Sequence, residues 1–134
     1  MIAVFDTNVL VSALWTPSGK AAFLLGQVIV GNIQLCYDFR ILDEYKEVLR
    51  RPKFRFASWQ VDALIDIIEH DGFSVIPSVI IDIDFPDDDD RPFYETAKFC
   101  NAPLVTGNLK HFPHDDCVFS IADFYRAFFS FSVS

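Results

Sequence analysis

The sequence is poor in the residue types that mark several protein classes. It has three cysteines, an odd number without a CxxC pair, which argues against a disulfide scaffold and fits a reducing compartment. Its 11 Lys and Arg are outnumbered by 19 Asp and Glu, giving a formal net charge of −8. A broad basic field is therefore excluded, and binding a polyanion such as nucleic acid would need bound cations or a local basic patch.

Long apolar runs are also missing. No uncharged apolar segment reaches the roughly 18 residues that span a bilayer, and no basic segment precedes the first apolar stretch, which Asp6 interrupts. We therefore expect a cytoplasmic protein with no membrane span and no signal peptide. The sequence does have an apolar fraction of 51%, with 15 phenylalanines, in 134 residues. This composition predicts one domain with a substantial core.

Short apolar runs alternate with segments of helical periodicity along the chain. Strands are expected at residues 2–5, 35–37, 73–76, 104–105 and 118–119, and helices at 20–30, 40–49, 58–70, 91–100 and 121–127. Ser58 and Ser120 are expected to cap helices, and Gly31 to end one. Strands that alternate with helices form parallel sheets with right-handed crossovers. The predicted fold class is α/β, a three-layer α/β/α sandwich around a central parallel sheet of about five short strands, over residues 1–127. Residues 128–134 are an apolar tail without helical period.

Asp6 directly follows the first predicted strand and is the most informative single residue. The crevice beyond the carboxyl ends of parallel strands is where α/β proteins bind ligands. An acid at this place can hold a cation or act as a nucleophile. Capping of the next helix explains Asp6 alone equally well.

Oxygen-bearing side chains recur at three later places that are strand ends or helix starts. They are Glu44 in a helix, the acidic run 87–90 before a helix, and Thr106-Gly107-Asn108 after a strand. Hard cations such as Mg²⁺ and Mn²⁺ take oxygen ligands, activate water and clamp phosphodiesters. Each segment alone is equally typical of a solvated surface or a turn, so that the combination carries the prediction.

Taken in order, five segments resemble the PIN domain family, and more narrowly its bacterial branch of toxins from toxin–antitoxin pairs. The segments are residues 4–10, 41–45, 51–54, 90–97 and 104–108. The resemblance extends over residues 1–127. It implies a PIN-like fold and a metal-dependent endoribonuclease that hydrolyses RNA phosphodiesters through an activated water.

The resemblance also implies the site residues. Asp6, Glu44 and Asp90 correspond to the catalytic acids that hold Mg²⁺ or Mn²⁺, with Asp89 as the alternative to the third. The family usually has a fourth acid in a Thr-x-Asp motif, where this chain has Asn108, a metal ligand without charge. The missing charge disfavours a tightly held second metal. The residues expected to orient water or the carboxylates are Thr7, Asn8, Thr106 and Asp89.

An acidic ribonuclease needs a local surface that attracts RNA. The densest basic segment contains Arg50, Arg51, Lys53 and Arg55. Phe54 and Phe56 lie within it and could stack on bases; a linker whose phenylalanines pack in the core explains them equally well. The implied partners are RNA and a cognate antitoxin protein, and the apolar tail suggests a homodimer or higher homo-oligomer.

Two other functions fit parts of the pattern. A haloacid-dehalogenase-like phosphatase also has an Asp after its first strand, but it needs a second Asp at the position of Asn8 and a Gly-Asp pair where this chain has Gly107-Asn108. A PIN-like domain that binds RNA or protein without cleaving it would explain Asn108 and the acidic surface.

A zinc site is weakly indicated. His111, His114 and Cys117 share a three-residue spacing, but the sequence offers no fourth ligand.

Overall fold

The structure is a computed structural model that describes residues 1–77, 85 and 88–130, and the statements below refer to these residues. The strands are β1 (Ile2–Phe5), β2 (Gln34–Tyr37), β3 (Phe73–Ser74), β4 (Leu104–Thr106) and β5 (Val118–Ser120). The α-helices are α1 (Thr7–Trp15), α2 (Lys20–Ile29), α3 (Phe39–Leu49), α4 (Ser58–Asp71), α5 (Arg91–Cys100) and α6 (Ile121–Phe128). Three 3₁₀ helices are η1 (Pro52–Phe54), η2 (Asp88–Asp90) and η3 (Leu109–His111).

The five strands form one parallel sheet in the order β3-β2-β1-β4-β5. The central strand β1 pairs with β2 on one side and with β4 on the other, where Phe5 is in register with Val105. All three central strands are buried for most of their length, as expected for a parallel sheet covered on both faces. The predicted α/β sandwich is confirmed.

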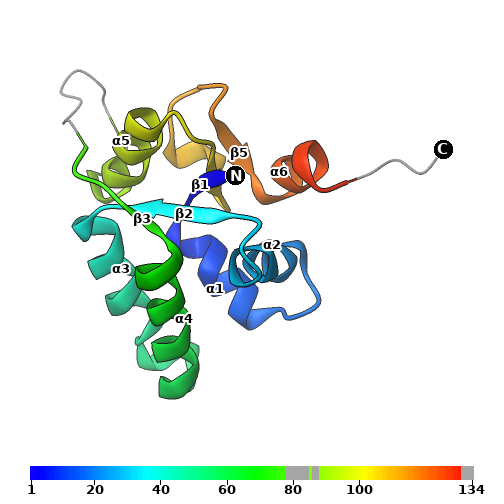
Figure 1. The fold of residues 1–134 in the computed structure, drawn as a ribbon, viewed down its shortest axis with the longest axis vertical. Coiled ribbons are helices and arrows are strands. Elements are labelled where there is room, and N and C mark those ends of the chain that lie inside the picture. The colour runs from blue at the N-terminus through cyan, green and yellow to red at the C-terminus, as the bar shows by residue number, and fades with distance from the viewer. Residues whose placement is uncertain (78–84, 86–87, 131–134) are drawn as a thin grey trace.

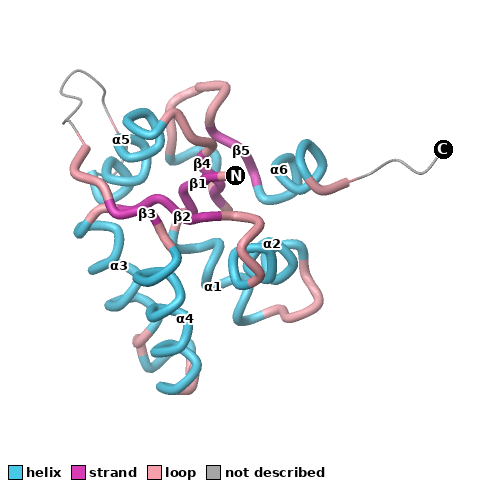
Figure 2. Tube along the Cα trace, viewed as in Figure 1, coloured by secondary structure: helices cyan, strands magenta, loops and turns pink. Residues whose placement is uncertain are grey.

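The direction of the crossovers assigns the helices to layers. The chain moves outward from β1 to β2 and then to β3, and returns from β3 to β4 in the opposite direction. Right-handed crossovers therefore place α1–α4 on one face and α5 on the other, as Figure 1 shows. The strands, magenta in Figure 2, lie between these layers. Helix α6 follows β5 and contacts α2.

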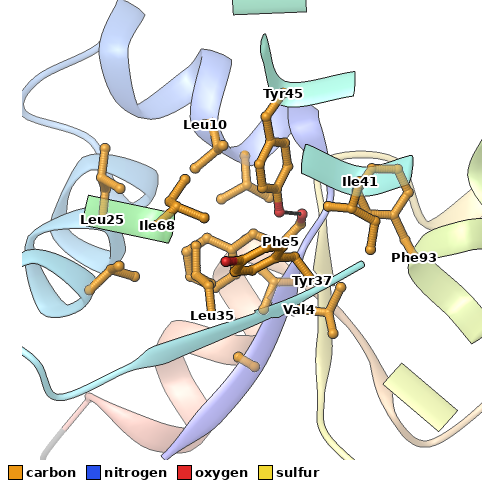
Figure 3. Packing of buried hydrophobic residues seen from close by; sticks show 14 of the residues in the cluster. Val4, Phe5, Leu10, Leu25, Leu35, Tyr37, Ile41, Tyr45, Ile68 and Phe93 are labelled. Carbon is orange, nitrogen blue, oxygen red and sulfur yellow. Dashed lines mark hydrogen bonds between the residues drawn. The ribbon is translucent and has the colours of Figure 1, made fainter. Parts of the chain in front are cut away.

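The core joins the helices to β1, and one contact in it positions the later site. Phe5, Leu10, Leu35, Ile41 and Tyr45 are fully or almost fully buried in one cluster, as Figure 3 shows. The Tyr45 hydroxyl donates a hydrogen bond to the carbonyl oxygen of Phe5. This bond fixes α3 against the carboxyl end of β1, so that the residues beside Tyr45 and Phe5 are held near each other.

Several element boundaries differ from the prediction. Strand β3 covers two residues instead of four. Strand β2 ends at Tyr37, which pairs with Ser74, and only one further bond, from the Val75 amide to the Tyr37 carbonyl, extends the pairing. The prediction that Ser58 caps α4 is wrong. Ala57 holds the N-cap position without a side-chain bond. Its carbonyl oxygen accepts from the amides of Gln60 and Val61, and the exposed first turn needs no side-chain cap.

The other helix ends agree more closely with the sequence. Helix α5 has the predicted bounds, and Ser120 caps α6 by accepting a hydrogen bond from the Asp123 amide. Gly31 follows the end of α2 with a φ of +90°, a conformation that glycine adopts without strain. Helix α6 includes Phe128, which was expected in the tail; its ring packs 4.8 Å from that of Phe124. Residues 131–134 of the predicted tail lie outside the described residues.

Two further observations concern the chain as a whole. Within the described residues, no single helix is long and apolar enough to span a membrane; α1 and α2 pass that test only as a pair, with a bend of 104° between them. Cys36, Cys100 and Cys117 are free thiols, as expected from their number and spacing.

Candidate active site

A cleft opens where the carboxyl ends of β1 and β4 lie side by side. The connections from these adjacent strands lead in opposite directions, to β2 and to β5. Open α/β sheets bind ligands at such a switch point. The cleft has a volume of about 350 Å³, and its lining residues are Asp6, Thr7, Asn8, Val11, Glu44, Val48, Arg51, Phe54, Asp89, Asp90 and His111.

Asp6 lies at the base of the cleft and is 5% exposed. It occupies the N-cap position of α1, but its side chain makes no capping hydrogen bond. One carboxylate oxygen instead accepts a hydrogen bond of 2.8 Å from the Thr106 hydroxyl. Burial raises the pKa of Asp6, and the bond from Thr106 opposes this shift. Of the two interpretations of Asp6, the geometry therefore favours a carboxylate held toward the cleft over a helix cap.

Glu44 faces Asp6 from α3. Its carboxylate accepts a hydrogen bond from the hydroxyl of Thr7, the first residue of α1. Burial raises the pKa of Glu44 to about 7, and the charges of Asp6, Asp90 and Asp89 add to the shift, whereas the Thr7 bond opposes it. The acidic side chains of three distant segments are therefore close enough to repel one another.

The acidic run before α5 contributes one largely enclosed carboxylate and one exposed residue to the cleft. The side chain of Asp90 is 14% exposed, and an Oδ2–Nδ1 distance of 3.2 Å joins it to His111. Asp89 lines the same cleft but is exposed, and the Asp88 side chain is 84% exposed and pairs with Arg91. Asp90 is thus the more enclosed of the two candidates for the third acid. Asp87 lies outside the described residues.

An ion-pair network joins α3 and α5, the helices next to these acids. Arg40 on α3 donates to Glu95 on α5 over 2.8 Å and to Asp38 over 2.7 Å. Both carboxylates are almost fully buried, and Asp38 also caps α3 through the amide of Ile41. This network fixes the helix that carries Glu44 relative to the helix that begins after Asp90.

His111 is a cleft residue that the sequence analysis assigned only to a weak zinc motif. Its Nδ1 faces Asp90, and its Nε2 lies 3.0 Å from the side-chain nitrogen, Nδ2, of Asn108. In the sequence, its position five residues after the strand end at Thr106 was the only indication that it could lie near the site. The contact with Asp90 could be found only from the fold. Within the described residues no group of three His, Cys, Asp or Glu side chains is arranged to hold a metal ion, so the zinc motif has no structural support.

Asn8 and Asn108 link the two loops at the switch point. The Asn8 side-chain oxygen accepts a hydrogen bond of 2.8 Å from the Gly107 amide. The backbone amide of Asn108 donates to the Thr106 hydroxyl oxygen over 2.9 Å, while its side-chain amide contacts His111. Asn8 therefore fastens the start of α1 to the end of β4, and Asn108 supports Thr106. A role of Asn108 as metal ligand stays a prediction.

Two of the four predicted RNA-contacting cations lie at the cleft. Arg51 lines it, and its guanidinium pairs with Glu47 over 2.8 Å at the surface. The Lys53 ammonium lies 5.1 Å from the centroid of the Phe54 ring, which also lines the cleft. A cation and an aromatic ring therefore line the same cleft as the carboxylates.

The rest of that basic segment is directed elsewhere. Arg50 pairs with Asp62 on α4 over 2.8 Å, and Arg55 is exposed in a left-handed backbone conformation. Phe56 packs against the core, whereas Phe54 reaches the cleft. The base-stacking interpretation therefore fits Phe54, and the core-packing interpretation fits Phe56.

The donor set of the cleft suits a hard divalent cation. It consists of carboxylate, hydroxyl and amide oxygens, which such cations prefer. Asp6, Glu44 and Asp90 border one space, although in the described residues they do not form a preformed three-ligand cage. Burial raises the pKa of Asp6 and of Glu44, and for Glu44 the neighbouring acids add to the shift. A bound cation would stabilise the charged form of both carboxylates.

Comparison with known families agrees with this geometry. The family model described as PIN domain matches residues 3–110. The chain belongs to the PIN domain family. PIN domains are generally nucleases, and those nucleases typically use divalent metals. The matched region includes Asp6, Glu44, Asp90 and Asn108. The match is to the PIN domain and not to a haloacid-dehalogenase-like phosphatase, the alternative family considered above. No curated protein and no solved structure matches the chain.

Proposed function

We propose that this PIN domain is a metal-dependent endoribonuclease of the toxin–antitoxin type that hydrolyses RNA phosphodiesters. The observation that carries the proposal is the position of Asp6, Glu44 and Asp90, which come from three distant segments and border one cleft at the switch point of the sheet. The family supports a nuclease. The cleft chemistry supports a reaction at a phosphate, because carboxylates and hydroxyls there can hold a divalent cation.

The side chains have distinct roles in the proposed reaction. Asp6, Glu44 and Asp90 would hold Mg²⁺ or Mn²⁺, which when bound activates water for in-line attack and stabilises the developing phosphate charge. Thr106 and Thr7 orient the carboxylates of Asp6 and Glu44 through their hydroxyl groups. Arg51, which lines the same cleft, neutralises a phosphate of the bound strand.

A nuclease assay tests the proposal. Native protein with Mn²⁺ is expected to cleave single-stranded RNA, and Asp6→Asn is expected to lose that activity while keeping its fold. Asp88→Asn is the matched control, since Asp88 is an exposed acid of the same run that does not line the cleft. Cleavage that survives Asp6→Asn, or that is unaffected by chelation of divalent cations, would contradict the mechanism.

A second candidate function follows from Asn108, which removes the charge of the family's fourth acid. The chain would then bind RNA or protein without cleaving it. Native protein that binds RNA but shows no hydrolysis with either Mg²⁺ or Mn²⁺ would favour this function.

The remaining parts of the proposal concern assembly. The protein acts in the cytoplasm, is held inactive by an antitoxin encoded in the adjacent reading frame, and forms a homodimer or higher homo-oligomer through exposed apolar side chains. Co-expression with the product of the neighbouring frame is expected to give a stable complex without nuclease activity. Sedimentation at micromolar concentration tests self-association, and a monomer throughout would contradict it.

A further inference from the structure

We propose that the rim of the cleft binds single-stranded RNA and that Trp15 stacks on one of its unpaired bases. This inference rests on the proposed ribonuclease function and adds the form of the substrate and a residue that contacts it. The supporting observations are the exposure of Trp15, its ring contacts, its place on α1 and the charges beside it.

Trp15 presents a large aromatic surface to solvent. It is the last residue of α1 and is 60% exposed, although tryptophan is on average highly buried. Its ring centroid lies 5.3 Å from that of Phe54 and 6.4 Å from that of Phe56, in both cases edge to face. The two phenylalanine rings stack on each other at 5.6 Å. We call these three residues the aromatic group.

Phe56 anchors the aromatic group to the core, and Phe54 connects the group to the cleft. Phe56 packs against the hydrophobic core, so that Trp15 is held in place instead of folding inward. Phe54 both contacts Trp15 and lines the cleft. An RNA strand that leaves the cleft past Phe54 therefore meets Trp15 next.

Helix α1 sets the distance between the cleft and Trp15. Asn8 and Val11 line the cleft, and Trp15 follows them at seven and four positions, on the same face of the helix. The axial rise from Asn8 to Trp15 is roughly 10 Å at 1.5 Å per residue. That corresponds to about three nucleotides of a stacked strand at ~3.4 Å each. The stacked base would thus lie a few nucleotides from the phosphate in the cleft.

The charges beside the aromatic group favour RNA as its occupant. Arg51 and Lys53 flank Phe54 in a chain whose net charge is −8. Aromatic rings next to cations are the combination with which proteins hold single strands, the rings taking bases and the cations the backbone. Bases in a duplex are stacked and paired, so that they expose only their edges. The substrate region at Trp15 is therefore unpaired.

The fluorescence of Trp15 gives a direct test. The chain has two tryptophans, and the second, Trp59, is 75% exposed on α4. In Trp59→Phe the only tryptophan is Trp15, and its emission is expected to be quenched by a short oligouridylate in a buffer with chelator, where binding occurs without hydrolysis. In Trp15→Phe the remaining Trp59 emission is expected to change little. Equal responses of the two variants, or quenching of Trp15 by duplex RNA of the same length, would overturn the inference.

Affinity measurements provide the second readout. Trp15→Ala is expected to weaken binding of the oligouridylate by roughly 5- to 150-fold, the range expected for losing one base–aromatic stack. Trp15→Phe should restore most of the affinity, and Trp59→Ala should stay within twofold of native. Circular dichroism checks that each variant is folded. Trp15→Ala that is folded and binds within twofold of native overturns the inference, and leaves the aromatic group to a protein partner.

The two proposals fail in different ways. If the native chain never cleaves RNA but binding depends on Trp15, the ribonuclease function is wrong and the stacking surface stands. If RNA is cleaved and Trp15→Ala neither weakens binding nor raises KM, the ribonuclease function stands and the stacking surface is wrong.

Discussion

Thr106 donates a hydrogen bond of 2.8 Å to Asp6 across 100 positions of sequence. The same hydroxyl oxygen accepts a bond of 2.9 Å from the Asn108 amide, and the residue has no exposed surface. A single side chain therefore orients the carboxylate at the end of β1 and closes the turn after β4. Since the two strands are neighbours in the sheet, this bond forms only when β1 and β4 are paired.

Replacement of Thr106 by valine should separate the hydroxyl from the shape of the side chain. Thr106→Val keeps the volume but leaves the Asp6 carboxylate and the Asn108 amide without this partner, so we expect a loss of about 1–3 kcal/mol in the free energy of unfolding. The pKa of Asp6 should rise further, because the Thr106 bond lowers it. Thr106→Ser retains the hydroxyl and should keep nuclease activity. Urea denaturation and cleavage assays on both variants test this.

Glu44 makes the stability of the metal-free protein depend on pH. Its pKa in the folded state is about 7, against 4.5 for an ordinary glutamate. Between these pH values the unfolded chain loses the proton while the folded chain keeps it, so that stability falls as pH rises from about 4.5 to 7. Glu44→Gln still accepts the Thr7 hydrogen bond but carries no charge. It should flatten the dependence and raise the Tm at pH 8 by a few degrees.

The measurement is the Tm with chelator across pH 5 to 8, for native protein and Glu44→Gln. Added Mn²⁺ should raise the Tm of the native protein at pH 8 and have a smaller effect on the variant, because a ligand that binds only the folded state stabilises it. Parallel Tm curves for the two proteins would show that Glu44 is not the group responsible.

The ion pair between α3 and α5 should be worth more than a surface pair of the same type. Arg40→Met removes the guanidinium that neutralises two nearly buried carboxylates, Asp38 and Glu95, and we expect a cost of about 3–5 kcal/mol. Arg50→Met removes a pair with Asp62 between two exposed side chains, and should cost about 0–1 kcal/mol. Chemical denaturation of both variants measures the difference. Similar costs would contradict the assigned role of Arg40.

Tyr45→Phe tests the bond that fixes α3 to β1. The buried Tyr45 hydroxyl is the donor to the Phe5 carbonyl, so its loss should cost about 1–3 kcal/mol and lower kcat by shifting Glu44 away from Asp6. Tyr37→Phe is the control, because its hydroxyl makes a longer, part-buried bond of 3.3 Å to the Glu69 carbonyl, away from Glu44 and Asp6. Should both variants retain native kcat, the position of Glu44 does not depend on this contact.

The sequence predicted the existence of the five strands and of the helices with strong periodicity, but not the order of the strands or the short length of β3. Strand positions followed from short apolar runs, and the bounds of α5 followed from Pro92 at its first turn. Helix α3 begins one residue before the predicted start because Asp38 caps it through the Ile41 amide, a local signal that was present in the sequence. The cap predicted at Ser58 failed because an exposed helix start does not require a side-chain partner.

The candidate site could be predicted only in part, since its contacts are between distant segments. Asp6 and Thr106 stood at strand ends, where the fold class alone brings them together. His111 and Trp15 could not be found in this way. His111 approaches Asp90 through a 3₁₀ helix after β4, and Trp15 gains its place from rings that belong to the segment after α3.

The bonds that hold the cleft together also determine when during synthesis it can exist. The hydrogen bonds of Asn8 to Gly107 and of Asp6 to Thr106 can form only after β4 has been synthesised. The bond between Thr7 and Glu44 requires only the segment up to α3. A ribosome that has released the first three helices has therefore exposed two of the acids but not the strand that aligns them. The cleft is therefore complete only after the fourth strand has emerged and paired with the first.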